Sequence, residues 1–256
     1  MWFLLKRFFR WLSPRRIWIA VDGPSGSGSS SLAKAIAKTL GIPFVDTGAF
    51  FRVIALAAQQ ASIDFHDESR IVGLLGGLKI KPTISKGNFF ISLNGEKIPD
   101  QELRTKSIDQ GSSIIATSPI IRPRIIELLK SIASKMSVVM EGRNVGISIL
   151  PNADLKVDVC AEPETRADRR VRQRYPDLPP ESPDFQVKLS EVLADINERD
   201  KRDRERAIDP VKTANGAFII DNTNVSLSDE VNLVIQEMVA KGVLRFRRRS
   251  IISMMF

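Results

Sequence analysis

One stretch near the start of the chain, from Val21 to Ser31 with the sequence VDGPSGSGSSS, constrains the fold more than any other. It follows a short apolar run, Ile17 to Val21, and precedes an alanine-rich segment with helical spacing, Leu32 to Lys38. This order predicts a buried strand, a tight turn and the N-terminus of a helix. Glycines allow the turn to bring several backbone N–H groups close to one anion, and the helix dipole adds partial positive charge. The stretch is therefore predicted to bind phosphate.

The spacing from Gly23 to Gly28 fits the P-loop motif, and Ser30 stands where that motif places a hydroxyl that reaches Mg²⁺. One position departs from the motif. A lysine normally follows the last glycine and reaches the β- and γ-phosphates, whereas this chain has Ser29. The loop alone leaves three alternatives open: a damaged nucleotide site, a compensated one, or no site.

The chain of 256 residues is long enough to bury a large core, and it carries 38 Lys and Arg against 30 Asp and Glu. The net charge of +8 favours an anionic partner, such as a nucleotide, a nucleic acid or an acidic membrane. Alternatively, it reflects basic tails, because part of the excess lies in Lys6 to Arg16 and Arg245 to Arg249. A single cysteine, Cys160, excludes an intrachain disulfide, and a single histidine, His66, leaves no Cys/His metal cluster; both favour a reducing cytoplasm.

The N-terminal segment MWFLLKRFFRWLSPRR, residues 1–16, mixes aromatic and aliphatic side chains with basic ones. Its apolar runs are too short for a spanning helix or a signal-peptide core. It can form an amphipathic helix on a membrane surface, a helix packed on the domain, or a frayed extension. The basic tail, residues 243–256, raises the same question.

Two further groups of polar residues follow apolar runs that are predicted to be strands. The sequence DTG begins at Asp46 after the pair FV, and EGRN begins at Glu141 after VVM. Ligands bind at this edge of open parallel sheets. Thr47 can donate to a phosphate and Arg52 can bind an anion through two N–H groups; a helix cap and a solvated helix residue are the alternatives. An acid at a strand end, such as Glu141, lies near Mg²⁺ in P-loop enzymes.

The middle of the chain changes to alternating polar and apolar residues. Leu78 to Ile84 and Asn88 to Leu93 alternate around Ser85-Lys86-Gly87, which predicts a β-hairpin, and Asn94-Gly95 is a second turn signal. We therefore expect a small β-rich insertion in an α/β core. The remaining predicted elements are helices in 105–134, strands in 155–159 and 217–220, and a terminal helix in 228–241.

Charge density rises after Glu164. The segment TRADRRVRQRY carries five arginines, and NERDKRDRERAIDP alternates arginines with acids. Alternating charge is usual on a solvated helix with salt bridges. The alternative is a mobile lid whose arginines cover phosphates during transfer, and the charge pattern does not separate the two.

Several of these segments, in this order and spacing, resemble bacterial cytidylate kinases. The matching segments are IAVDGPSGSGSSSLAKAIAKTLG, VDTGAFFRVIALAA, LNGE with LRT, EGRNVGISILPNADLK, ERDKRDRERAIDP and IIDNTN. The resemblance covers roughly Ile17 to Ala240. It implies a nucleoside monophosphate kinase that uses ATP and Mg²⁺ to convert CMP or dCMP to CDP or dCDP. It also implies a cytoplasmic monomer that binds no nucleic acid. Only the net charge of the chain favours a nucleic-acid partner.

The resemblance implies a three-layer α/β fold, the P-loop kinase fold, in which helices cover a parallel sheet. A small β-rich insertion binds the nucleoside monophosphate, and a helical lid covers the site. On this chain the kinase domain would span residues 17–242, with the insertion at about 66–115 and the lid at about 163–212. The N-terminal extension, 1–16, and the basic tail, 243–256, lie outside it.

The resemblance also gives individual residues a role. The ATP phosphates are expected to bind a loop formed by Gly23, Pro24, Ser25, Gly26, Ser27, Gly28, Ser29, Ser30 and Ser31, with Ser30 on the metal. The acceptor CMP is expected to bind Asp46, Thr47, Arg52, Arg122, Arg143, Asp203 and Arg206, with the last two at the cytosine edge. The transferring phosphoryl group is expected to be neutralised by Arg143, Arg166, Arg170 and Arg199, with Arg169 beside them.

Three residues depart from the family pattern: Ser29 replaces a lysine, Asn144 replaces the second acid of a GRD segment, and Phe51 replaces a tyrosine. The loss of a cation such as the lysine from a preorganised site costs about 2–4 kcal/mol, or roughly 10²–10³ in rate. Two hypotheses follow. Either the chain is a working kinase in which another cation, such as a lid arginine, covers part of the missing charge, or it is a silent relative that binds nucleotides as a regulatory module.

Overall fold

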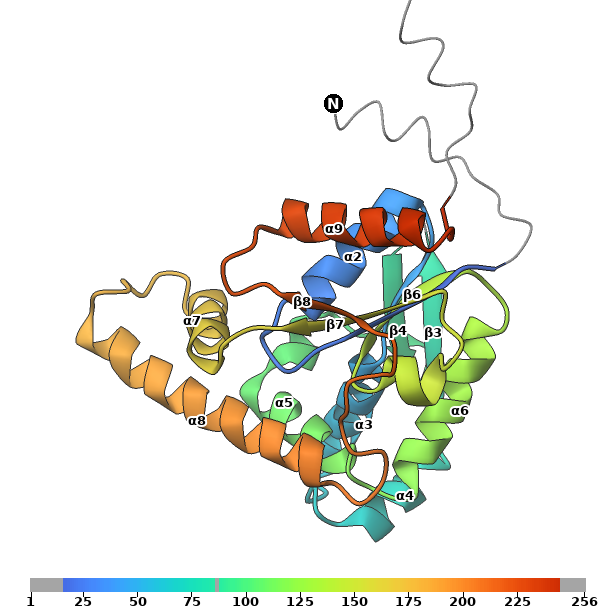
Figure 1. Cartoon of the computed structure of the whole chain (residues 1–256). Helices are drawn as coiled ribbons and strands as arrows, with labels where there is room; N and C mark the ends of the chain where they lie inside the picture. Colours follow the sequence, from blue (N-terminus) through green and yellow to red (C-terminus); the bar gives the residue numbers. More distant parts are fainter. Residues whose placement is uncertain (1–15, 86–87, 245–256) are drawn as a thin grey trace, which may run out of the picture.

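A five-stranded parallel sheet organises the part of the chain that this computed structural model describes, residues 16–85 and 88–244 (Figure 1). The strands lie in the order β2 (Phe44–Asp46), β6 (Val138–Gly142), β1 (Trp18–Asp22), β7 (Leu155–Cys160) and β8 (Phe218–Asp221). Every neighbouring pair is parallel. Because β1 lies in the middle, the loop that follows it reaches the centre of the sheet's carboxyl edge.

Helices cover both faces of this sheet, as the consecutive apolar residues of its strands require, because successive side chains point to opposite faces. Ile19 and Val21 of β1 pack in one core with α2 (Ser29–Leu40) and α9 (Leu227–Ala240). Ala20 belongs to the core on the opposite face, with α3 (Gly48–Gln60), α4 (Glu68–Leu75), α5 (Lys106–Ile115) and α6 (Ile121–Ala133) (Figure 1). The predicted three-layer α/β fold with a parallel sheet is confirmed.

The predicted β-hairpin is confirmed as part of a separate antiparallel sheet. Its strands are β3 (Ile80–Ser85), β4 (Asn88–Leu93) and β5 (Glu96–Lys97). Asn94 and Gly95 both have positive φ, 53° and 96°, as expected for the tight turn between β4 and β5. A 3₁₀ turn, η1 (Glu102–Arg104), then leads toward α5. These elements lie within the predicted insertion, whose boundaries stay a prediction.

Helices α7 (Pro163–Arg174) and α8 (Pro183–Glu205) extend away from the sheet as a pair (Figure 1). They share a small core of their own, which contains Ala167, Val171, Phe185, Val192 and Ile196. Prolines at the start of each helix suit a first turn that needs no N–H donor there. This pair makes up most of the predicted lid region, 163–212.

The predicted N-terminal extension and basic tail fall almost wholly outside the described residues, including the alternative of a membrane-surface helix. Within the two described ranges, no helix has both the length and the apolar character needed to cross a lipid bilayer. The π-helical turn η2 (Val145–Ile149), which follows β6, completes the secondary structure around the carboxyl edge of the sheet.

Candidate active site

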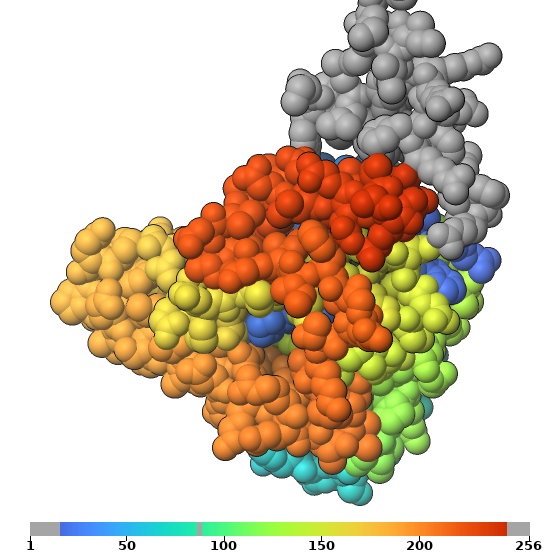
Figure 2. All heavy atoms as spheres, viewed as in Figure 1, coloured from blue at the N-terminus to red at the C-terminus, as the bar shows by residue number. Residues whose placement is uncertain are grey.

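A pocket of about 330 Å³ opens at the carboxyl edge of the parallel sheet, between the P-loop, α3, α5, α6, α7 and α8. In the space-filling view, a hollow bordered by yellow and orange atoms leaves blue atoms of the N-terminal region visible (Figure 2). Eight arginines and five carboxylates line the pocket, which gives it a formal charge of +3. The arginines are Arg52, Arg104, Arg122, Arg143, Arg169, Arg170, Arg199 and Arg206, and the carboxylates belong to Asp46, Asp109, Glu141, Asp203 and Asp209.

Two glycines in the left-handed region shape the loop between β1 and α2. The φ angles of Gly26 and Gly28 are 82° and 92°, values that other residues rarely adopt. The first turn of α2, with its unpaired N–H groups, begins directly after them. Seven of the nine predicted phosphate-binding residues line the pocket; Gly23 and Ser27 do not. Gly23 lies behind the loop, where a Cβ would come within 2.6 Å of a backbone carbonyl oxygen, that of Val159.

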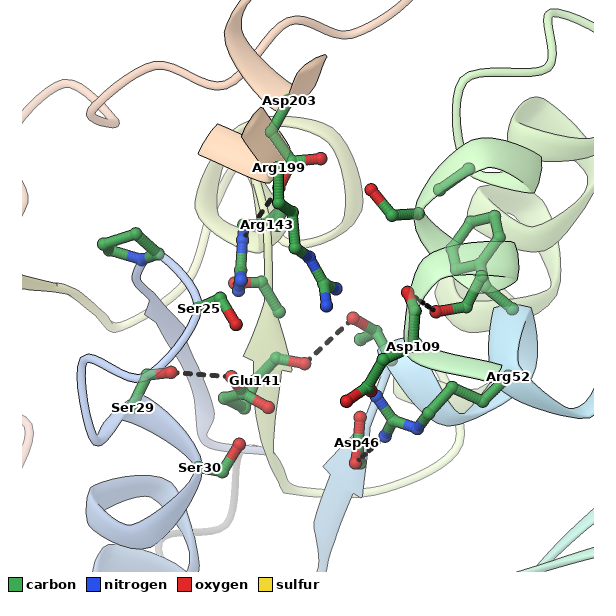
Figure 3. A pocket seen from close by; sticks show the side chains of 18 of the residues that line it. Ser25, Ser29, Ser30, Asp46, Arg52, Asp109, Glu141, Arg143, Arg199 and Asp203 are labelled. Atoms are coloured by element: carbon green, nitrogen blue, oxygen red, sulfur yellow. Dashed lines mark hydrogen bonds and ion pairs between the residues drawn. The ribbon is translucent and has the colours of Figure 1, made fainter. Parts of the chain in front are cut away.

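Ser29 fills the position of the P-loop lysine and is only 4% exposed. Its Oγ donates a 2.7 Å hydrogen bond to Oε1 of Glu141, which lies near the end of β6 (Figure 3). The hydroxyl is neutral and sits one carbon from the backbone, whereas a lysine ammonium is a cation on a four-carbon stem. At this position, the loop therefore contributes a partner for an acid and no positive charge.

Ser30 and Glu141 lie on the same wall of the pocket (Figure 3). Mg²⁺ prefers oxygen ligands, and in nucleotide sites it is usually held by one or two protein groups together with phosphates and waters. A hydroxyl and a carboxylate match this preference. Among the described residues, no group of three or more His, Cys, Asp or Glu side chains is placed to hold a metal ion. The hydroxyl of Ser30 and the carboxylate of Glu141 fit a magnesium ion whose other ligands are phosphates and waters.

Arg52 forms a buried ion pair with Asp46, with 2.5 Å between Nη2 and Oδ2. Burial alone would raise the pKa of Asp46, but Arg52 and Arg104 hold that pKa below its usual value. The alternative of a solvated Arg52 is wrong, because this residue is only 7% exposed. Thr47 makes no side-chain cap either; its Oγ1 donates to the main-chain oxygen of Glu141 at 2.9 Å. Both residues line the pocket.

Asp203 holds two of the predicted substrate-binding arginines. Its Oδ2 accepts a hydrogen bond from Nε of Arg143, and its Oδ1 accepts one from Nη1 of Arg206, each at 3.3 Å. Arg199 stands one turn before Asp203 on α8, and both Arg199 and Arg143 extend into the middle of the pocket (Figure 3). The structure thus brings these four predicted residues together on one side of the pocket.

Helix α5 contributes three pocket residues that sequence reasoning missed: Asp109, Ser112 and Ser113. Asp109 forms ion pairs with Arg170, one of the predicted catalytic residues, and with Arg174. The available signal is their position on the buried face of an amphipathic helix, where polar residues at most 7% exposed require partners. A fourth pocket residue that was missed, Asp209, follows the end of α8, and its Asp-Pro pair is a turn signal.

Arg166, which is also predicted to be catalytic, does not line the pocket. Its Nη1 donates to the main-chain oxygen of Ser25 at 3.1 Å. Its neighbour Arg169 lines the pocket and donates to Oδ1 of Asn222, whose Nδ2 donates to the main-chain oxygen of Ser27 at 2.6 Å. Through these contacts, α7 supports the P-loop from behind.

Four buried side-chain N or O atoms lack a hydrogen-bond partner among residues 16–85 and 88–244, and three of them belong to arginines of the pocket. They are Nε of Arg52, Nε of Arg199 and Nη2 of Arg206. An unsatisfied buried donor costs about 1–3 kcal/mol, which an incoming acceptor removes. Burial lowers the pKa of Arg199 and of Arg206 to about 10, so both side chains remain cationic at neutral pH. The pocket therefore has the charge and the free donors to bind an anion with several oxygens.

Comparison with known proteins shows the family to which this chain belongs. The family model for cytidylate kinase matches residues 19–240. Among curated relatives, the cytidylate kinase of Acholeplasma laidlawii is 32% identical over 227 residues, which cover 88% of this chain and 97% of that protein. The cytidylate kinase of Thermosipho melanesiensis is 38% identical over 218 residues, 85% of this chain and 94% of its own length. The cytidylate kinase of Bacillus cytotoxicus is 33% identical over 221 residues, with 86% and 95% covered. The chain therefore belongs to the cytidylate kinase family.

Proposed function

We propose that this protein transfers the γ-phosphate of ATP to CMP or dCMP, which gives ADP and CDP or dCDP. The observation that carries the proposal is the set of three buried arginine donors without a hydrogen-bond partner, on Arg52, Arg199 and Arg206, in one pocket beside a P-loop. Phosphoryl transfer depends mainly on positioning and on neutralisation of charge. A cationic pocket with unsatisfied donors supplies both.

ATP binds with its phosphates on the loop from Pro24 to Ser31, where the left-handed glycines and the first turn of α2 present backbone N–H groups. Ser30 and Glu141 would hold a Mg²⁺ ion that accompanies the nucleotide, and this ion would neutralise phosphate charge. Arg166 and Arg169 keep the loop in place through Ser25 and Asn222. The preorganised loop then needs little rearrangement when ATP enters.

The acceptor binds on the other side of the pocket. Arg52, Arg143 and Arg199 bind the monophosphate, because their guanidinium groups suit phosphate oxygens. Asp203, near the end of α8, and Arg206, just after it, hold the nucleoside together with Arg122, which shares the partner Asp209 with Arg206. Arg170 of α7, which Asp109 anchors, covers the phosphoryl group as it moves. Closure of α7 and α8 over the pocket excludes water, which would otherwise accept the phosphoryl group.

Ser29 sets the central question for turnover, because the P-loop lysine is missing. Arg199 and Arg143 extend into the centre of the pocket and supply positive charge there (Figure 3). We expect the parent protein to turn over CMP and Ser29→Lys to change kcat by less than about 10-fold, since these arginines cover most of the lost charge. Ser29→Ala is the control, because it removes the hydrogen bond to Glu141 without adding charge.

A coupled assay with ATP and Mg²⁺ against CMP, dCMP, UMP and dTMP tests the proposal, together with calorimetry of CMP binding. Turnover of CMP or dCMP above the other acceptors supports it. No turnover by the parent, combined with turnover by Ser29→Lys, would contradict an active enzyme and leave a nucleotide-binding module. Absence of CMP binding would contradict both. We expect a cytoplasmic monomer, as the family resemblance implies, and light scattering after size exclusion checks the oligomeric state.

A further inference from the structure

We propose that Asp209, in the loop after α8, is a positioning residue that sets the spacing of Arg122 and Arg206 against the nucleoside monophosphate. Neither the P-loop nor the arginine-rich pattern points to this residue. The inference rests on the proposed function, because it concerns the CMP side of the pocket. It explains how the chain works with Asn144 in place of the acid of the GRD segment.

The Asp209 carboxylate forms the meeting point of the two arginines. Its Oδ2 accepts from Nε of Arg122 at 2.7 Å and from Nη2 of Arg122 at 2.5 Å. The same oxygen lies 3.7 Å from Nη2 of Arg206, the buried donor without a hydrogen-bond partner. The Asp209 main chain adds to this, because its carbonyl oxygen accepts from Nε of Arg206 at 2.6 Å. One residue therefore contacts both guanidinium groups.

Asn144 fixes Asp209 in this position. Its Nδ2 donates to Oδ1 of Asp209 at 2.7 Å and to the main-chain oxygen of Pro210 at 2.7 Å, while its Oδ1 accepts from the backbone N–H of Lys212 at 3.0 Å. Ser148 donates to the same Oδ1 of Asp209 at 2.5 Å. Only an amide can donate and accept in this way, and residue 144 is 2% exposed.

An acid at position 144 would not fit beside Asp209. It could not donate to the three oxygens that surround Nδ2, and it would place a second carboxylate where the amide now lies 2.7 Å from Oδ1. Two buried carboxylates this close repel each other strongly. Asn144 and Asp209 are thus a matched pair: the carboxylate that the family pattern has at 144 is supplied from 209.

The charge balance of this corner explains why one carboxylate is required. Arg122 and Arg206 are both buried, 4% and 6% exposed, and their like charges oppose each other. Without Asp209, Arg206 would still form an ion pair with Asp203. Arg122 would lose its ion pair with a carboxylate, because no other is found for it among the described residues. With Asp209 present, the two guanidinium groups stay at a fixed spacing, and Nη2 of Arg206 remains free for the substrate.

Three variants test the inference: Asp209→Asn, Asn144→Asp and the double variant, each assayed for kcat and for KM with CMP and with ATP. Each single variant is expected to raise KM for CMP by roughly 10-fold or more, while KM for ATP stays within about threefold, because the P-loop is untouched. In the double variant, residue 144 carries the carboxylate and residue 209 carries the amide. Its KM for CMP is expected to fall to within about threefold of the parent.

The outcomes distinguish a failure of this inference from a failure of the proposed function. The inference is overturned if the double variant does not fold. It is also overturned if the fold-increase in its KM for CMP equals the product of the fold-increases in the two single variants, because positions 144 and 209 would then act independently. If Asp209→Asn alone does not fold, a folded double variant with near-parental KM still supports the inference. Glu127→Gln, which breaks an exposed ion pair with Lys130 on α6, is the control and should match the parent. A parent that neither turns over nor binds CMP refutes the proposed function instead, whereas an active parent with an unchanged Asp209→Asn variant refutes only this inference.

Discussion

Gly142 has no room for a side chain. It lies at the end of β6, and a Cβ placed there would come within 2.0 Å of Oγ1 of Thr47 and 3.2 Å of Cγ2 of Val145. Thr47 cannot withdraw freely, because its Oγ1 also bonds to the main-chain oxygen of Glu141. A single missing methyl group thus allows β2, β6 and the turn η2 to meet beside the pocket.

The variant Gly142→Ala is expected to destabilise the protein by about 1–3 kcal/mol, since the added atom overpacks a rigid site. Urea unfolding measures the change in the free energy of unfolding. Gly73→Ala is a matched control, because that glycine lies in α4 with no atom near its missing Cβ. The control should gain about 0.4–1 kcal/mol. Equal stability of Gly142→Ala and the parent would show that Thr47 can move aside.

At the scale of elements, α7 and α8 support the P-loop through one buried ion pair. Nη1 of Arg166 lies 2.8 Å from Oδ2 of Asp200, and the two side chains are 5% and 10% exposed. The same nitrogen donates to the main-chain oxygen of Ser25. The P-loop, which we propose binds ATP, is therefore connected to both helices of the predicted lid region.

Removal of one partner from this pair leaves a buried charge alone, so Arg166→Met is expected to cost about 3–5 kcal/mol. The double variant Arg166→Met with Asp200→Leu should recover most of that loss, because no charge stays buried. It should still bind ATP more weakly than the parent, because Ser25 loses its donor. Urea unfolding and calorimetry with ATP measure the two effects. Arg172→Gln, an exposed ion-pair partner of Asp168 on the same helix, is the control; a double variant as unstable as Arg166→Met would contradict this account.

The elements were predictable because their signals are local. Apolar runs gave the strands, Gly28 and Ser29 marked the start of α2, and Asn94-Gly95 gave the second turn. The P-loop was recognisable for the same reason, whereas the roles predicted for Arg199, Asp203 and Arg206 came from the family resemblance. Asp109 and Asp209 could not be recognised, since their importance comes from arginines 61 and 87 positions away, which only the fold brings near. The contact of Arg166 with the main-chain oxygen of Ser25, 141 positions away, could not be predicted for the same reason.

At the scale of the whole molecule, a buried carboxylate joins β1 to the turn η2. Asp22, at the end of β1, accepts hydrogen bonds from the backbone N–H groups of Val145 at 2.7 Å and Gly146 at 2.8 Å. Burial raises the pKa of Asp22 to about 6, although these two hydrogen bonds oppose the shift. The folded protein therefore holds a proton at Asp22 in a pH range where the unfolded chain, with its usual pKa of 3.8, has lost it.

This difference fixes the sign of a pH effect. Between about pH 4 and 6 the folded state binds more protons at Asp22 than the unfolded state, so this residue contributes less stability as the pH rises. Above about pH 6 its contribution no longer changes. We expect the Tm of the parent to fall relative to the Tm of Asp22→Asn between pH 4 and 6. Above about pH 6 the difference between the two Tm values should stay constant. Parallel Tm curves over that range would contradict the raised pKa.

Helix α8 spaces its pocket residues by whole turns: Arg199, Asp203 and, one residue beyond its end, Arg206. A substitution elsewhere on this helix leaves that spacing intact, but the loss of a single residue between Phe185 and Arg199 would rotate everything after it by about 100°. All three side chains would then leave the pocket together. The surface loop 176–182 before the helix has no such constraint. A change of length is therefore compatible with the site in the loop but not in the helix. The number of residues in α8 before Arg199 is itself a requirement of the site.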